Sequence, residues 1–132
     1  MNESGQQPTV GAFPVHRDSR GVLGIAEFGS LPFVPRRFFW IQGVAQGETR
    51  ANHGHRECEQ LVFVQQGSVA GFTIDASGDR VEFKLELGDW VYVPTRHWLQ
   101  LNLFSGNAVV GVFASLPFDA SEYISSPEEL GS

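Results

Sequence analysis

The sequence predicts an all-β protein, built as a sandwich or small barrel of short strands. The chain has 132 residues, with 15 Gly and 7 Pro spread along it, which indicates many turns and favours short strands over long helices. Residues 81–87 alternate apolar and polar side chains without a fault, and residues 99–103 do the same. Such alternation is typical of a strand with one buried face. Short apolar runs between glycine turns support the same fold class.

The length of the chain is close to the commonest size of a single domain. We expect residues 1–12, which are mostly polar, to form a flexible N-terminus and residues 13–132 to form one domain. Turn-forming residues at 75–79 connect two strands of a predicted hairpin, and a glycine turn at 88–89 leads into another strand. Only the tail indicates a helix, a short C-terminal one that starts within residues 126–129.

The composition argues against several classes of function. The formal net charge is −6 and no run of Lys or Arg occurs, so binding of nucleic acid through phosphate neutralisation is not expected. No stretch reaches the roughly 18 apolar residues that suggest a membrane-spanning helix, and the N-terminus lacks the features of a secretion signal. We therefore expect no membrane association and a cytoplasmic location. Cys58 is the only cysteine, which excludes an intrachain disulfide.

Residues 50–60, RANHGHRECEQ, contain two histidines two positions apart, His53 and His55. On a strand their side chains share a face, so in a small barrel both point either into the cavity or into solvent. The residues alone leave three interpretations open: a metal site, a pair that transfers protons, or exposed side chains without a function. Without a metal, two charged imidazoles repel each other, and at least one should be neutral near pH 7. A base and an acid at the operating pH are what an isomerase needs.

The spacing around the histidine pair resembles the sequence motifs of the cupin barrels. Gly47, the two histidines and Glu59 match the first cupin motif, and residues 88–94 resemble the opening of the second. This resemblance implies a cupin fold, a jelly-roll β-barrel. Metal-dependent cupins take a further histidine from the second motif, and the resulting set suits Fe, Mn, Ni or Zn. Here that position is Leu99, and His97 lies two residues earlier, so we expect no metal and keep a metal-dependent cupin enzyme as an alternative.

A closer resemblance covers nearly the whole chain, from about residue 20 to residue 124. Its blocks are RGVLGIAE (20–27), LPFVPRRFFWI (31–41), RANHGHRECEQ (50–60), GSVAGFTID (67–75), WLQLNLFSGNAVVGVFAS (98–115) and FDASEYI (118–124). In these blocks the chain resembles the WxcM-like cupins, whose members include the nucleotide-sugar 3,4-ketoisomerases. In the last block, Asp119 and Tyr123 match strongly preferred positions of that family.

The resemblance implies an isomerase that acts on the dTDP-linked sugar dTDP-4-keto-6-deoxyglucose and moves its carbonyl from C4 to C3, in the biosynthesis of deoxyamino sugars. It also implies a homodimer with strands exchanged between subunits, and no metal or organic cofactor. The two histidines are then the catalytic pair. We assign the carbon proton to His55 and the oxygen proton to His53, and leave the reverse assignment open. A non-catalytic protein that binds the sugar nucleotide is a further alternative.

We predict substrate contacts for a larger set of side chains. The resemblance implies that Arg20 and Arg50 contact the pyrophosphate or the sugar. Trp98, Gln100 and Asn102 share one face of a predicted strand. The predicted substrate-binding residues are Arg20, Arg37, Arg50, Gln60, Trp98, Gln100 and Asn102. The chain also departs from the family, because Phe39 stands where a tyrosine is expected near the sugar and Ala51 stands where a glycine is expected.

Overall fold

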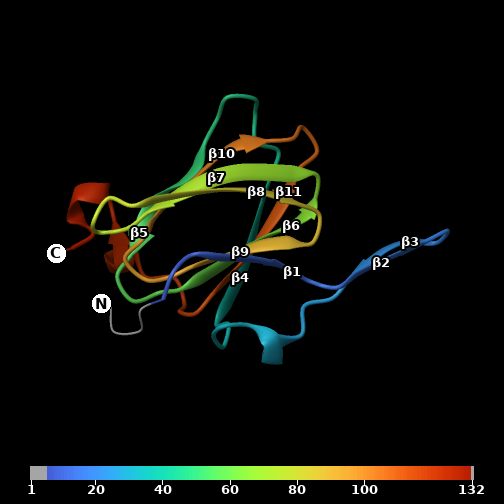
Figure 1. The fold of residues 1–132 in the computed structure, drawn as a ribbon, viewed down its shortest axis with the longest axis horizontal. Helices are drawn as coiled ribbons and strands as arrows, with labels where there is room; N and C mark the ends of the chain where they lie inside the picture. The colour runs from blue at the N-terminus through green and yellow to red at the C-terminus, as the bar shows by residue number, and fades with distance from the viewer. Residues whose placement is uncertain (1–5, 132) are drawn as a thin grey trace.

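Two antiparallel sheets of five strands each form the body of the molecule, which this computed structural model describes over residues 6–131 (Figure 1). The first sheet, in the order β1-β9-β6-β11-β4, contains β1 (Thr9–Ala12), β4 (Arg37–Gln42), β6 (Gln60–Gln66), β9 (Asp89–Val93) and β11 (Val109–Ala114). The second, in the order β12-β5-β10-β7-β8, contains β5 (Arg50–His55), β7 (Ser68–Ile74), β8 (Arg80–Glu86), β10 (Trp98–Phe104) and β12 (Tyr123–Ile124). The predicted all-β class is confirmed.

The main hydrophobic core lies between the two sheets. The inward faces of both supply its side chains, which are Val62, Val64, Val69, Phe83, Leu85, Val91, Val93, Leu99, Leu101, Val110 and Val112. In β8 the predicted alternation places Phe83 and Leu85 in this core, while Lys84 between them is exposed. Burying one such apolar side chain contributes roughly 1.5–3 kcal/mol, so this layer holds the sheets together.

A β-bulge in β10 changes the alternation predicted for that strand. Leu99 and Leu101 lie in the core, as expected, but Leu103 is 67% exposed. The register between β10 and β7 shifts between Leu101 and Leu103, and an extra residue in a strand turns the following side chain to the other face. The prediction that the three leucines share a buried face is therefore wrong for Leu103.

A second, smaller cluster attaches the C-terminal segment to the sheets. It contains Trp98 of β10 together with Ile124 and Leu130, which are 0% and 1% exposed. The segment includes two 3-10 turns, η2 (Ala120–Glu122) and η3 (Pro127–Glu129), on either side of β12. The short C-terminal helix predicted from the sequence is present as η3, a single turn.

The N-terminal part of the chain differs from the expectation. The sequence predicts a flexible segment over residues 1–12, but residues 9–12 form β1, which pairs with β9 along its whole length. An edge strand of this kind is held by backbone hydrogen bonds, which every residue type except proline can donate, and four residues are too few for an alternating pattern to reveal it. Residues 1–5 lie outside the described residues.

The hairpin that follows extends away from the body of the molecule (Figure 1). Its strands, β2 (Val15–Asp18) and β3 (Gly21–Gly24), pair with each other in a separate two-stranded sheet. A 3-10 turn, η1 (Phe28–Ser30), then leads toward β4. The hairpin thus leaves both of its edges unpaired within the described residues of the chain.

Candidate active site

The two histidines lie near the end of β5 with their rings in contact. Their ring centroids are 4.9 Å apart, and the ring planes are nearly perpendicular, at 81°. His55 is buried at 6% exposure, and His53 is half-buried. Two positions apart on a strand, both side chains point to the inner face of the sheet, which is one of the two orientations that the spacing allows.

Tyr123 completes a group of three rings. Strand β12 pairs antiparallel with β5 so that Tyr123 lies opposite His55. The Tyr123 ring centroid is 4.9 Å from that of His53 and 4.8 Å from that of His55. The sequence marks Tyr123 only as a preferred position of the family, since no local pattern shows that a residue so far along the chain packs beside β5.

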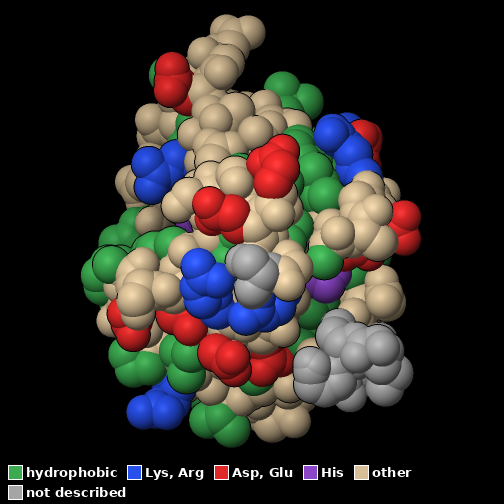
Figure 2. Space-filling view, turned by 90° about the vertical axis from the view of Figure 1, so that its left-hand side faces the viewer, with side chains coloured by type: hydrophobic (Ala, Val, Ile, Leu, Met, Phe, Trp, Pro, Cys, Tyr) green, Lys and Arg blue, Asp and Glu red, His purple; other side chains and the backbone are tan. Residues whose placement is uncertain are grey.

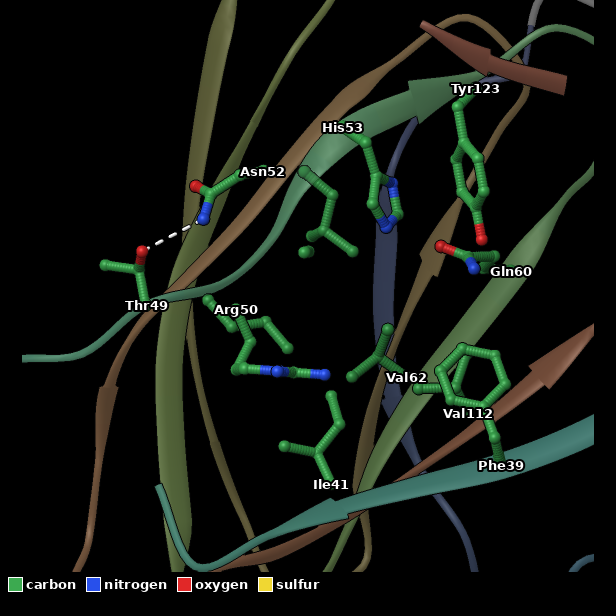
Figure 3. Close-up of a pocket in the computed structure, with 13 residues that line it drawn as sticks. Phe39, Ile41, Thr49, Arg50, Asn52, His53, Gln60, Val62, Val112 and Tyr123 are labelled. Atoms are coloured by element: carbon green, nitrogen blue, oxygen red, sulfur yellow. Dashed lines mark hydrogen bonds between the residues drawn. The ribbon is translucent and has the colours of Figure 1, made fainter. Parts of the chain in front are cut away.

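A cavity of about 440 Å³ opens beside these rings, a volume within the usual range of small-molecule sites. Figure 3 shows Arg50, His53 and Tyr123 directed into it. Its walls come from both sheets and consist of Phe39, Ile41, Thr49, Arg50, Ala51, Asn52, His53, Gln60, Val62, Leu99, Leu101, Val112 and Tyr123. His55 is not one of these residues and instead contacts the rings of His53 and Tyr123.

Burial keeps both imidazoles neutral near pH 7. The pKa of His55 is lowered to about 3, chiefly by desolvation and further by the charges of His53 and Arg37. The pKa of His53 is also lowered, again chiefly by desolvation and further by the charges of Arg37 and Arg50. The sequence predicts that at least one imidazole is neutral near pH 7. Because the pKa values of both histidines are lowered, both imidazoles are neutral at that pH.

Three imidazole nitrogens of this pair are buried without a hydrogen-bond partner: Nδ1 of His53 and both ring nitrogens of His55. An unpaired buried polar atom costs about 1–3 kcal/mol, so such atoms are rare in folded proteins and call for a specific explanation. A hydroxyl or carbonyl group of a ligand could provide the missing partner. His53 lines the cavity, so its ring is available for hydrogen bonding and proton exchange with a bound molecule, whereas His55 contacts the rings of His53 and Tyr123.

Two arginines make this part of the molecule electropositive. The Arg50 guanidinium extends into the cavity (Figure 3). The Arg37 guanidinium carbon lies 5.2 Å from the ring centroid of Phe39 and 5.8 Å from that of Phe118, and its buried Nε has no hydrogen-bond partner. Neither arginine forms a salt bridge with another described residue, so both positive charges remain available to an anionic ligand.

A bulge in β5 immediately precedes His53. Ala51 and Asn52 have positive φ angles of 71° and 60°, a conformation that costs roughly 1 kcal/mol or more for a residue with a side chain. Two hydrogen bonds hold Asn52 there: its Nδ2 donates to Thr49 Oγ1 at 2.9 Å, and its Oδ1 accepts from Gln100 Nε2 at 2.7 Å. Gln100 therefore supports the strand that carries the histidines and is not itself a cavity residue.

Three predicted substrate contacts lie outside the cavity. Trp98, Gln100 and Asn102 do not line it, whereas Leu99 and Leu101 of the same strand do. Trp98 packs in the second hydrophobic cluster, and Asn102 Nδ2 donates to Gln100 Oε1 at 3.4 Å. The inner face of β10 carries its leucines, so these three side chains do not line this cavity, and their contact with a substrate stays a prediction.

The remaining predicted contacts fall into two groups. Arg50 and Gln60 line the cavity, and Arg37 lies close enough to lower the pKa of both histidines. Arg20 lies elsewhere, at the turn between β2 and β3, where its Nη2 is 2.5 Å from a carboxylate oxygen of Asp18 and its side chain is 87% exposed. Because the hairpin points away from the sheets (Figure 1), Arg20 is not part of this chain's own cavity.

The described residues do not match the donor set of a metal-dependent cupin. Within residues 6–131, no group of three or more His, Cys, Asp or Glu side chains is placed to hold an ion. Leu99 lines the cavity where such a cupin has a further histidine. Glu59, at the position of the metal-binding glutamate, accepts a hydrogen bond from the Tyr92 hydroxyl at 2.5 Å. These residues do not fit a metal of the kind that the alternative interpretation requires.

Comparison with known proteins identifies the family. The family model described as FdtA: WxcM-like, C-terminal matches residues 6–131. The chain belongs to this WxcM-like family. The chain is similar in sequence to the TDP-4-oxo-6-deoxy-alpha-D-glucose-3,4-oxoisomerase of Aneurinibacillus thermoaerophilus. The two are 31% identical over 109 residues, which cover 81% of this chain and 78% of the relative.

Solved structures share the fold of this WxcM-like chain. The WlaRB TDP-quinovose 3,4-ketoisomerase from Campylobacter jejuni has a TM-score of 0.84 and 25% identity, over 95% of this chain and 97% of that chain. A mutant of the 3,4-ketoisomerase QdtA from Thermoanaerobacterium thermosaccharolyticum, in complex with TDP-4-keto-6-deoxyglucose, has a TM-score of 0.85 and 22% identity, over 93% and 90%. The cupin-like fold predicted from the sequence is confirmed.

The surface of this WxcM-like chain carries charges of both signs. On the side of the molecule shown in Figure 2, basic and acidic side chains lie interspersed and form no extended basic face. Among the described residues, no helix has the length and apolar character that crossing a membrane requires. The expectations that the chain does not bind nucleic acid and is cytoplasmic stay predictions.

The low pKa of His55 predicts a loss of stability on acidification. The unfolded chain takes up a proton at His55 as the pH falls below about 6.5, whereas the folded chain does so only near pH 3. Between these values the unfolded state binds more protons, so the free energy of unfolding decreases as the pH falls and is fully retained above about pH 6.5. Urea unfolding at pH 7.5 and 5.0 should show this decrease in the wild type and a smaller one in His55→Asn.

His16→Asn is the matched control for this measurement, because His16 is exposed on the β2–β3 hairpin. It should keep the pH dependence of the wild type. An equal decrease in the wild type and in His55→Asn would contradict a buried, neutral His55.

Proposed function

We propose that the protein is a nucleotide-sugar 3,4-ketoisomerase, which converts a TDP-linked 4-keto-6-deoxyhexose such as dTDP-4-keto-6-deoxyglucose into its 3-keto isomer. The observation that carries the proposal is the pair of buried imidazoles with unpaired ring nitrogens beside a cavity that contains Arg50. Membership of the WxcM-like family and 31% identity to a 3,4-oxoisomerase support it.

The proposed reaction moves protons at carbon and at oxygen. The C4 carbonyl acidifies the neighbouring C3–H, a neutral imidazole removes that proton, and an enediolate forms across C3 and C4. A proton then returns to C4 while the O3 proton is transferred to O4, which leaves the carbonyl at C3. A neutral imidazole can accept a proton at one nitrogen and donate at the other. We assign the carbon proton to His55 and the oxygen proton to His53, and keep as the alternative the reverse assignment, in which the carbon proton goes to His53, the imidazole that lines the cavity.

The two arginines suit the charges of such a substrate and its intermediate. Arg50 lines the cavity, which supports a role in binding the diphosphate, a group that guanidinium groups bind well. Arg37, whose charge acts on both histidines, can stabilise the negative charge that develops on the sugar oxygens. The diphosphate also opposes the lowering of the histidine pKa values, and so brings them closer to the pH at which proton transfer is efficient.

Incubation with dTDP-4-keto-6-deoxyglucose in D2O, followed by proton NMR, tests the proposed function. We expect the 3-keto isomer to accumulate with deuterium at C4. Thermal stabilisation by the nucleotide sugar without any turnover would instead establish a non-catalytic binding protein. Turnover that is lost on treatment with a chelator and restored by a divalent metal would establish the metal-dependent alternative.

We also propose that the active form is a homodimer with exchanged β2–β3 hairpins. The hairpin pairs with no other described strand of its own chain, and it exposes Val22 and Leu23, at 51% and 60%. Apolar side chains on a projecting hairpin are expected at a protein interface. Exchange of the hairpins would carry Arg20 to the other subunit. The substrate contact predicted for Arg20 could then form in the cavity of that subunit.

Light scattering coupled to size-exclusion chromatography tests the dimer. The wild type should elute at twice the chain mass of 14.5 kDa, and Leu23→Glu should shift it toward the monomer. Leu103→Glu is the matched control, since Leu103 is similarly exposed but lies on β10, away from the hairpin. A wild-type protein that is monomeric at micromolar concentration contradicts the exchange.

A further inference from the structure

Tyr123 reaches the site from the C-terminal segment, and several contacts fix its position. Main-chain pairing joins β12 to β5, and the neighbouring side chain of Ile124 is fully buried, at 0% exposure, in the second cluster. The Glu122 carboxylate accepts hydrogen bonds from the backbone N–H groups of Glu57 and Cys58, both at 2.9 Å. The segment before and after Tyr123 is therefore anchored beside the end of β5.

The ring of Tyr123 covers both imidazoles. Its centroid lies within 4.9 Å of the centroid of His53 and 4.8 Å of that of His55. Phe118 continues this apolar cover, with its ring centroid 6.0 Å from that of Tyr123. Because desolvation is the main cause of the neutral state of both histidines, a ring in contact with both is part of what excludes water from them.

The hydroxyl of Tyr123 points into the cavity, toward the side chain of Gln60 (Figure 3). The chain has two tyrosines, and the other, Tyr92, donates its hydroxyl to Glu59 and does not line the cavity. Phe39, where the family resemblance implies a tyrosine, lines the cavity without a hydroxyl. Tyr123 is therefore the phenol that a ligand in this cavity meets.

We propose that Tyr123 is a further catalytic residue, whose ring shields both histidines from water and whose hydroxyl donates a hydrogen bond to a sugar oxygen that becomes negative in the enediolate. The inference rests on the proposed function, because the oxygen belongs to the keto-sugar. A donor placed where negative charge develops lowers the barrier of the chemical step. Tyr123 keeps its proton throughout, so the proton transfers assigned to the histidines stay balanced.

Tyr123→Phe tests the hydroxyl, because this variant keeps the ring. Loss of one donor to a developing oxyanion typically reduces kcat by about 100- to 1,000-fold, and we expect kcat in the NMR assay to fall by about 100-fold with little change in KM. Tyr92→Phe is the matched control, since it removes a hydroxyl outside the cavity. It should keep kcat within a few-fold of the wild type. Wild-type kcat in Tyr123→Phe overturns the hydrogen bond to the sugar.

Tyr123→Ala tests the ring, in a measurement that needs no substrate. Removal of the ring admits water to both imidazoles and should raise the pKa of His53 and of His55 toward the ordinary value of about 6.5. Titration of the imidazole C–H signals by proton NMR measures both, and Tyr123→Phe should titrate like the wild type. If Tyr123→Ala does not fold, Tyr123→Leu serves in its place. Unchanged histidine titrations in a folded variant overturn the shielding role.

These measurements separate failure of this inference from failure of the proposed function. A wild-type protein without turnover rejects the ketoisomerase and, with it, the hydrogen bond from Tyr123 to the sugar. The NMR titrations still decide the role of the ring in that case. Turnover by the wild type and an equal kcat in Tyr123→Phe reject the role of the hydroxyl alone.

Discussion

Replacing His55 with asparagine is expected to reduce kcat by about 1,000-fold and to stop the incorporation of solvent deuterium at C4 of the sugar. Asparagine has a similar size and can form hydrogen bonds, but it cannot take up and release a proton near neutral pH. A positioned acid–base group contributes about 10²–10⁴ to the rate, and the loss of the residue assigned to the carbon proton removes that contribution. Proton NMR of the product formed in D2O measures both effects.

His53→Asn should also reduce turnover, while leaving detectable exchange at carbon. Loss of carbon exchange in His53→Asn and its retention in His55→Asn would reverse the two assignments. Incorporation of deuterium by the double variant would reject histidine catalysis altogether. His16→Asn, on the exposed hairpin strand β2, should behave as the wild type and controls for any general effect of losing an imidazole.

Leu130→Ala is expected to lower the free energy of unfolding by about 2–5 kcal/mol, the range found for such truncations in a core. Leu130 is 1% exposed and packs with Trp98 and Ile124 in the cluster that attaches the C-terminal segment. Its side chain also lies close to Gly54, between the two histidines, where an added Cβ would be 3.1 Å from Leu130 Cδ2. Urea unfolding followed by circular dichroism measures the loss.

Leu130→Ala should also affect the active site. The cluster around Leu130 holds β12, and β12 carries Tyr123, so a loosened segment should lower kcat and raise the pKa of the covered histidines. Leu103→Ala removes a leucine that is 67% exposed and should change the free energy of unfolding by less than about 0.5 kcal/mol. Equal stability of Leu130→Ala and the wild type would contradict the anchoring role of the cluster.

Regular alternation predicted the strands that lie between the sheets. In β8, Phe83 and Leu85 are buried as their spacing requires, because a strand with one buried face must repeat every two residues. The pattern was less informative where the backbone departs from that period. The bulge in β10 turns Leu103 outward, and β1 has only four residues, too few to show an alternation.

The sequence likewise predicted some features of the candidate site and missed others. The spacing of His53 and His55 places both rings on one face, and the motif around them predicts Arg50 and Gln60 as neighbours of the ligand, which the cavity now contains. The face of β10 that meets the cavity was not predicted. Gln100 hydrogen-bonds to Asn52 in the β5 bulge instead of facing the cavity.

The sequence by itself determined the all-β class, the family and the histidine pair, because each depends on residue type and short-range spacing. Only the tertiary structure decided that both imidazoles are desolvated, that Tyr123 covers them and that Arg20 lies outside the chain's own cavity. The first two features depend on the pairing of β12 with β5, two segments far apart in the chain, and the third depends on a hairpin that pairs with neither large sheet. Desolvation is a property of the assembled surroundings of a group, and no local pattern of residues encodes it.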